Sequence, residues 1–408
     1  MTVNAPAVNA PAGTRVRLQP LTYVDDADGV VVGRPDTGSY GVFPPEGAEL
    51  LRWLEAGGTL EAGAERWHAA TGQQLDADDF VGILDDLGFV LADGADRAEL
   101  PPVHWQRFAR MAFSPPAWAL YVAVVAGGLA TMILDPGVRP GYRDVFFTSH
   151  ISFIPVALAL IQIPLLLVHE GFHALAARRL GLPSTLGIGR RFYYLVAETR
   201  LDSLYSVPRA RRYLPFLAGA LIDAVGVGAF TMASAAGRHL GAPPWVSGLA
   251  LALAFSGVLR ISWECLFYLQ TDFYFVISTA SGCTDLHGAA RFRLRALLRA
   301  ALRRPALPPA GDWSGRDLAA ARWYAPLMIA GYGVSLATLV LVGVPTAVRF
   351  WTIVARRLDG TVPVTAGSVI DTVFFALFSL AELGLLAYVT IRDLRRRRAA
   401  RQPERNPS

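Results

Sequence analysis

The sequence predicts a mostly α-helical, polytopic membrane protein with a small α+β domain at its N-terminus. Of its 408 residues, 53% are hydrophobic and only 17% are charged, a more apolar balance than that of an ordinary soluble protein. Beyond residue 115 the chain contains apolar runs close to the roughly 20 residues that cross a bilayer. Residues 14–100 instead hold short apolar stretches separated by Gly, Pro and Asp turn signals. These observations exclude a wholly soluble protein and separate a 14–100 domain from a 115–391 membrane domain.

The first hundred residues read as a tail followed by a winged-helix-like domain. Residues 1–13 are rich in Pro and Ala and predict a disordered tail. β-prone stretches and amphipathic periodicity then predict strands and helices. The expected strands span 16–18, 29–32, 39–43 and 88–91, and the expected helices span 46–55, 60–71 and 77–87. The domain is acidic rather than basic, so we expect no nucleic-acid partner.

About six membrane spans follow, and the arginines predict their orientation. The expected spans are 117–134, 151–177, 214–235, 246–269, 324–344 and 369–391. All 38 basic residues are Arg. The loops after the second and fourth spans and the tail at 392–408 together hold 23 of them, whereas the opposite loops hold six. The positive-inside rule therefore predicts a multi-pass protein of the plasma membrane whose termini, including the basic tail, both lie in the cytoplasm.

The second span carries an H-E-x-x-H motif, formed by His169, Glu170 and His173. On a helix the two imidazoles are four residues apart and project from one face, as two ligands of one zinc ion require. Glu170 is adjacent and suits the role of general base that takes a proton from water. His169 precedes Arg178 by nine residues, which places the motif about 13 Å inside the cytoplasmic surface. The alternative is a pair of helix-end histidines that reach toward the interface, with Glu170 paired to an Arg.

A catalytic zinc needs a third protein ligand, and Asp272 is the best candidate. It lies where the apolar fourth span is broken by polar residues, at a depth similar to that of His169. Asp272 also suits the role of a helix cap. Other candidates remain open, and they are Asp285, His287, Cys283 and Glu264. For Glu264 the i, i+4 spacing from Arg260 predicts an ion pair instead.

Asp223 interrupts the apolar third span among small residues that allow close helix packing. Its carboxylate could hydrogen-bond a substrate backbone or a histidine of the motif. A purely structural hydrogen bond within the membrane is the alternative.

The segment HEGFHALAARRLG resembles the motif helix of the site-2 protease family of intramembrane zinc metalloproteases. Residues 219–223 resemble the family's Gly-Pro-x-x-Asn element, with Ala220 in place of Pro and Asp223 in place of Asn. The fourth-span segment resembles the family's Asp-Gly motif, with Phe273 in place of Gly. The resemblance covers about residues 150–300. It implies a zinc metalloendopeptidase in which Asp272 is the third metal ligand.

The N-terminal region is similar to PqqD-like domains, which recognise leader peptides of ribosomally made, modified peptides. A PqqD-like domain followed by this type of membrane protease resembles the peptide zinc metalloproteases found beside peptide-modification genes. The resemblance implies removal of a leader from a precursor peptide. Two alternatives stay open: regulated proteolysis of a membrane-anchored signalling protein, and a non-enzymatic exporter or immunity protein with a relic motif. Expected partners are a peptide substrate and the lipid bilayer. The oligomeric state is left open.

Overall fold

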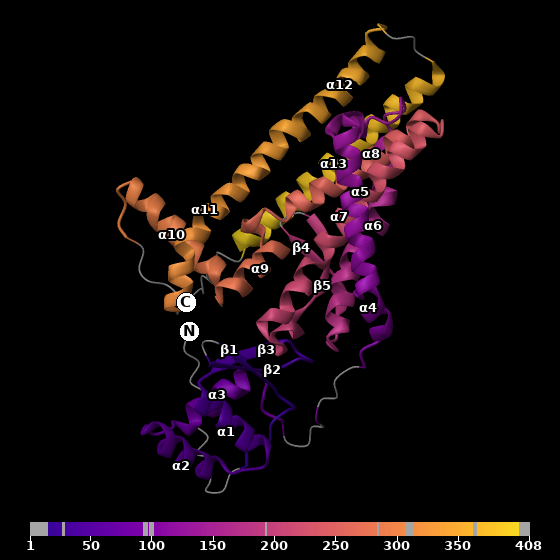
Figure 1. The fold of residues 1–408 in the computed structure, drawn as a ribbon. Coiled ribbons are helices and arrows are strands. Elements are labelled where there is room, and N and C mark those ends of the chain that lie inside the picture. Colours follow the sequence, from indigo (N-terminus) through magenta and orange to yellow (C-terminus); the bar gives the residue numbers. More distant parts are fainter. Residues whose placement is uncertain are drawn as a thin grey trace.

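The computed structural model describes residues 15–26, 29–92, 97, 102–191, 194–283, 285–306, 313–361 and 365–399. The predicted fold class is confirmed: the described chain is mostly helical, with a small three-stranded antiparallel sheet and helices at its N-terminus (Figure 1). The predicted tail at 1–13 lies outside the described residues. Helix α13 continues through residue 399, so the first part of the predicted basic tail is helical.

The N-terminal sheet has the strand order β1-β2-β3, in which both pairs are antiparallel. The expected strands at 29–32 and 39–43 are present, but those expected at 16–18 and 88–91 are reduced to an isolated bridge between Leu18 and Val90. The first strand lies later, in a stretch whose two Asp residues read as a turn. These elements are β1 (Thr22–Asp26), β2 (Gly29–Arg34), β3 (Ser39–Phe43), α1 (Pro45–Glu55), α2 (Leu60–Thr71) and α3 (Ala77–Asp86).

One face of this sheet packs on the three helices. Val30 and Val32 of β2 point to this face and join a core with Leu51 of α1 and Leu84 of α3. The alternation of side chains along a strand sends Val31 to the opposite face. Val31 is nevertheless only 7% exposed, so the second face of the sheet is covered as well.

Five helices among the described residues are long and apolar enough to cross a membrane. Four of them follow the predicted spans closely, and the fifth runs through a π-helical turn far beyond its predicted ends. They are α5 (Pro115–Leu134), α6 (Phe153–Arg179), α7 (Arg209–His239), α8 (Pro244–Trp263) and the continuous helix Gly315–Leu358, which comprises α11 (Gly315–Thr338), η5 (Leu339–Gly343) and α12 (Val344–Leu358). The sixth predicted span corresponds to α13 (Ala366–Ala399), whose residues 366–381 form a shorter apolar helix.

Shorter elements connect these helices. A two-stranded antiparallel hairpin and a 3-10 turn join α6 to α7, and α9 and α10 lie between α8 and α11 (Figure 1). These elements are α4 (Gln106–Ala112), η1 (Pro136–Val138), η2 (Tyr142–Val145), β4 (Thr185–Arg191), β5 (Tyr194–Arg200), η3 (Asp202–Ser206), η4 (Phe267–Leu269), α9 (Asp272–Ser281) and α10 (Leu286–Ala301).

Two features hold the helices together at fixed distances. Gly128 of α5 faces Gly228 of α7 so closely that a Cβ on Gly128 would lie 2.4 Å from the Cα of Gly228, and small residues at such contacts let helices approach. At the start of α6, the buried Asp371 of α13 accepts hydrogen bonds from the backbone N–H groups of Ile151 and Ser152, both at 2.9 Å. Arg357 of α12 forms an ion pair with the same carboxylate at 2.7 Å.

Candidate metal centre

Helix α6 brings the two motif histidines together inside the helical bundle. His169 and His173 are 6% and 3% exposed, and their rings lie 4.9 Å apart. Their Nε2 atoms are separated by 3.2 Å. The i, i+4 spacing of the motif produces this geometry because both side chains project from one face of an α-helix.

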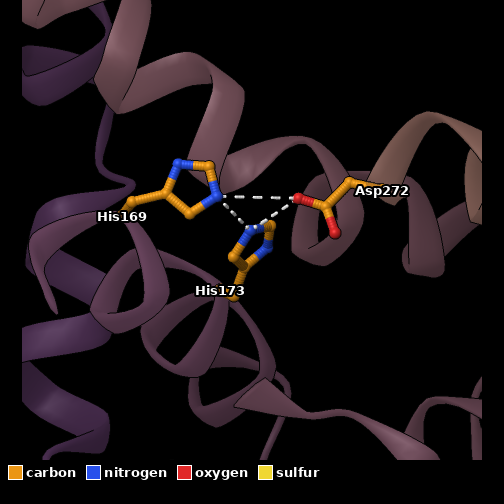
Figure 2. A group of neighbouring side chains, drawn as sticks. All are labelled: His169, His173 and Asp272. Carbon is orange, nitrogen blue, oxygen red and sulfur yellow. Dashed lines mark hydrogen bonds and ion pairs between the residues drawn. The ribbon is translucent and has the colours of Figure 1, made fainter. Parts of the chain in front are cut away.

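Asp272 is the first residue of α9 and approaches both histidines (Figure 2). Its Oδ2 lies 2.8 Å from Nε2 of His173 and 3.7 Å from Nε2 of His169. The side chain of Asp272 is 22% exposed, whereas the histidine side chains are almost fully covered. The structure thus unites the three predicted metal ligands in one group that could hold a metal ion.

Hydrogen bonds on the far side of each ring orient the histidines. Nδ1 of His169 lies 2.9 Å from Oδ2 of Asp223, and Nδ1 of His173 lies 2.7 Å from the backbone oxygen of Pro215. A carbonyl oxygen can only accept, so Nδ1 of His173 carries the proton. The same assignment for His169 follows from the carboxylate of Asp223. Both Nε2 atoms therefore present lone pairs toward Asp272, the arrangement that metal-binding histidines use.

Asp223 belongs to a larger polar network inside the membrane region. Its Oδ1 accepts hydrogen bonds from Nε and Nη2 of Arg260, at 2.9 and 2.8 Å. Arg260 also donates to the side-chain oxygen of Gln162 on α6. The prediction of an ion pair between Arg260 and Glu264 is therefore wrong. Arg260 extends across to α7 because the deeply buried Asp223 needs a compensating charge.

Glu264 is used in a different way. Its Oε2 accepts a hydrogen bond of 2.8 Å from the backbone N–H of Asp272, and its own backbone oxygen accepts one of 2.7 Å from the Thr271 hydroxyl. Glu264 therefore fixes the start of α9. A carboxylate at the first turn of a helix also interacts favourably with the helix dipole.

Gly219 of α7 closes one side of the group. A Cβ built on Gly219 would lie 2.3 Å from Nε2 of His173 and 2.4 Å from Nε2 of His169. No side chain fits there without displacing a histidine. The backbone of α7 thus borders the point toward which the ligand atoms converge.

Glu170 is also buried, and it is held by the hairpin that follows α6. The hydroxyl of Thr199 on β5 lies 2.9 Å from Oε2 of Glu170 and 2.9 Å from its backbone oxygen. One hydroxyl has a single proton, so it donates to one of these two acceptors at a time. The contact ties β5 to the motif helix beside the two histidines.

The donor set fits a metal ion. Ligand atoms of a tetrahedral zinc with bonds of roughly 2.0–2.2 Å lie about 3.3–3.5 Å apart, and the three observed separations of 2.8, 3.2 and 3.7 Å bracket that value. Two imidazole lone pairs and a carboxylate at such distances repel one another unless a cation or proton lies between them. Two nitrogens and one oxygen are ligands that zinc accepts.

The other candidate ligands lie outside this group. Asp285 caps α10 by accepting from the backbone N–H of Gly288 at 2.9 Å, and it also accepts from the indole of Trp313. Cys283 lies 3.8 Å from the backbone oxygen of Arg316. His287 packs against the ring of Tyr274, and burial lowers the pKa of His287, with the nearby charge of Arg291 adding to the effect.

Sequence reasoning named Asp223 as a candidate partner of a motif histidine but missed the other supporting residues, Arg260, Pro215 and Thr199. Arg260 read as half of a local ion pair, and Pro215 and Thr199 gave no signal because a carbonyl and a hydroxyl carry no charge. A charged residue in an apolar span was the available sign for Arg260. No protein-family model, curated protein or solved structure matches this chain significantly.

Proposed function

We propose that this protein is a membrane-embedded zinc metallopeptidase. The main support is that two imidazole nitrogens and the Asp272 carboxylate converge, while the opposite nitrogen of each ring already forms a hydrogen bond. The adjacent Glu170 supplies an acid–base group in the same buried region. The resemblance of the motif helix to site-2 proteases supports the same assignment.

In this proposal His169, His173 and Asp272 hold the metal. Zinc, when bound, polarises a peptide carbonyl and makes a nearby water more acidic. Glu170 takes a proton from that water as the water oxygen bonds to the peptide carbonyl carbon. Glu170 then passes the proton to the amine nitrogen as the C–N bond breaks. Thr199 orients Glu170 through its hydroxyl. Asp223, backed by Arg260, holds His169 in the tautomer that binds metal.

The proposed orientation places both termini in the cytoplasm of a cell whose plasma membrane contains the protein. The arginine-rich loops and the N-terminal sheet lie near the same end of the helical bundle, which supports this orientation (Figure 1). Asp272 has the most exposed side chain of the three ligands, and α9 leads from it to Thr279, which lines a cavity shared with the N-terminal sheet. Water and substrate therefore enter from the cytoplasm.

The proposed substrate is a precursor peptide, from which the enzyme removes a leader. Support comes from the small N-terminal sheet-and-helix domain, whose edge strand β3 has no further strand beside it in the described part of the chain. An extended peptide can add to such an edge. The resemblance to PqqD-like domains gives the class of peptide.

The test compares metal content with hydrolysis in the full-length protein, purified in detergent and offered a fluorogenic peptide library. Glu170→Gln is expected to retain stoichiometric zinc and to lose hydrolysis by about 10²–10⁴-fold, the usual contribution of a general acid–base group. Glu65→Gln, an exposed change on α2, is the matched control and should leave both properties unchanged.

Undiminished hydrolysis by Glu170→Gln would overturn the mechanism. A parent protein with no bound zinc would instead favour the non-enzymatic alternative. Cleavage of a helical, membrane-anchored substrate that lacks any leader would point to regulated proteolysis of a signalling protein.

A further inference from the structure

A cavity of about 470 Å³ lies between the N-terminal sheet and the membrane helices. The sheet contributes residues from all three strands, including Val31 and Val42. The opposite wall comes from η3, α7 and α9, with Tyr205, Arg212 and Phe275 among its residues. This volume is within the range of about 300–1,000 Å³ typical of ligand sites. The proposed mechanism does not use this cavity.

The sheet is held over the cavity by specific contacts. Asp26 of β1 forms an ion pair with Arg209 of α7, with Oδ1 and Nη2 2.6 Å apart. The rings of Tyr40 on β3 and Tyr205 on η3 lie 5.7 Å apart. These contacts account for the burial of Val31 on the sheet face that points away from the domain's own helices. The cavity is therefore framed on both sides by ordered elements.

Both helices that line the cavity, α7 and α9, lead to the metal centre. On α9, Phe275 lines the cavity and lies one helical turn after the ligand Asp272. On α7, Arg212 lines the cavity and lies one turn before Pro215, whose carbonyl orients His173. The cavity therefore begins about one turn, roughly 5 Å, from residues that bind or orient the metal ligands.

An aromatic pair strengthens this connection. Phe216 of α7 stacks on Phe275 of α9, with ring centroids 5.4 Å apart and planes inclined by 17°. A ligand that displaces the Phe275 ring would move the first turns of α9. Phe275 thus connects the cavity to the first turn of α9, which carries Asp272.

The lining has a mixed apolar and cationic character. Val31, Val42 and Phe275 offer apolar surface, whereas the charged lining residues are two arginines and one aspartate. Arg212 is only 5% exposed, and it donates hydrogen bonds to the backbone oxygens of Val207 and Tyr205, which are neutral. The lining therefore carries a net positive charge, and this favours a ligand that combines an acidic group with an apolar one.

We propose that this cavity binds a segment of the peptide substrate in which an acidic residue neighbours a bulky apolar one. This inference rests on the proposed peptidase function and names a specificity site for it. The acidic side chain faces Arg212, and the apolar side chain packs against Phe275 and the outer face of the sheet. A peptide held there continues along α9 toward Asp272.

The test measures binding without catalysis, in full-length Glu170→Gln protein in detergent. Two fluorescein-labelled peptides of equal length carry a central Leu flanked by Glu in one peptide and by Lys in the other. Fluorescence anisotropy should show about tenfold tighter binding of the acidic peptide. Val42→Trp and Thr279→Trp fill the cavity from opposite walls, and each should weaken that binding about tenfold.

Matched controls place the same side chain outside the cavity. Ala70→Trp on α2 and Ala280→Trp on α9 are exposed positions and should bind like the parent. Two walls are tested because one variant alone could fail to fold, which circular dichroism and metal content will reveal. Equal affinity for the two peptides, or equal effects of cavity and control variants, would overturn the proposal.

Hydrolysis measured on the parent and on the cavity-filling variants with Glu170 intact separates this inference from the peptidase assignment. If the peptides bind as predicted but the parent protein hydrolyses none, the proposed binding site stands and the peptidase assignment fails. Normal hydrolysis by both cavity-filling variants with Glu170 intact would refute the cavity's role in substrate binding. The peptidase assignment would then still stand. Binding of short-chain phosphatidylglycerol, blocked by the same variants while neither peptide binds, would replace the peptide by an anionic lipid.

Discussion

Two buried carboxylate–arginine clusters contact helix α6, one at its start and one in its middle, and they differ in one respect. At its start, the Asp371 carboxylate accepts from two backbone N–H groups and pairs with Arg357, so acceptors face donors throughout. In the middle of the helix, Asp223 pairs with Arg260 in the same way, but His169, His173 and Asp272 direct acceptors toward one another. Burial and charge are common to both clusters; only the second leaves electron pairs converging on one point.

The difference separates structural from functional charge inside a membrane protein. Ionisable groups at membrane depth are costly and usually mark function, but a closed network offsets part of that cost by pairing donors with acceptors. A converging set of acceptors does not, because its members repel until a cation binds. Counting buried charges alone would have ranked the two clusters equally.

The largest effect is expected from Asp272→Ala, which removes the only carboxylate of the converging group. Zinc affinity should fall by more than the roughly 10–100-fold typical of supporting residues, because a direct ligand is lost. Metal analysis after dialysis against a chelator measures this change. Zinc content equal to that of the parent would move the third ligand elsewhere and remove the contrast between the clusters.

Gly219→Ala should be the next most damaging change at this cluster. The added methyl group would lie within 2.4 Å of both Nε2 atoms, so at least one ligand must move. Metal binding should be lost while the protein still folds in the membrane. Gly226→Ala is the matched control on the same helix, since its Cβ would meet nothing nearer than 3.9 Å. Equal zinc binding by both variants would contradict the described geometry.

Asp371→Ala tests the closed cluster and should give the opposite pattern. It removes the counter-charge of Arg357 and the acceptor of two backbone N–H groups, which should lower the free energy of unfolding by about 3 kcal/mol. Thermal unfolding in detergent measures this loss. Zinc content per folded molecule should be unchanged, because the two histidines lie far from the start of α6 and Asp272 lies on α9. Loss of zinc by Asp371→Ala without a loss of stability would show that the two clusters do not have separate roles.

The smallest of these effects is expected from Asp223→Asn, which belongs to the functional cluster but touches no metal. Asparagine keeps the shape and weakens the orientation of His169, so zinc affinity should fall about 10–100-fold. Arg260→Gln acts through the same carboxylate. Combined in one protein, the two changes should therefore cost less than the sum of their separate effects. Strict additivity would show that Arg260 acts independently of Asp223.

Hydropathy and residue spacing predicted the features of the molecule that depend on local sequence. The motif histidines and Asp272 were found because polar residues in apolar runs are conspicuous. The ends of the fifth span were missed because hydropathy marks only the apolar part of a helix. The strand at Thr22–Asp26 was not predicted because its Asp residues are turn signals, and the Arg209 that pairs with Asp26 is 183 residues away. Long-range partners of this kind leave no local trace.

The cavity wall also contains Cys283, one of only two cysteines in the chain. In a Cys265→Ser protein it becomes a unique thiol, just beyond the ten residues of α9 that begin at Asp272. A helix of that length spans about 15 Å. A spin label on Cys283 and a paramagnetic ion such as Cu²⁺ at the histidines would therefore form a reporter pair across α9. Any peptide that shifts this helix would be registered as a change in their separation.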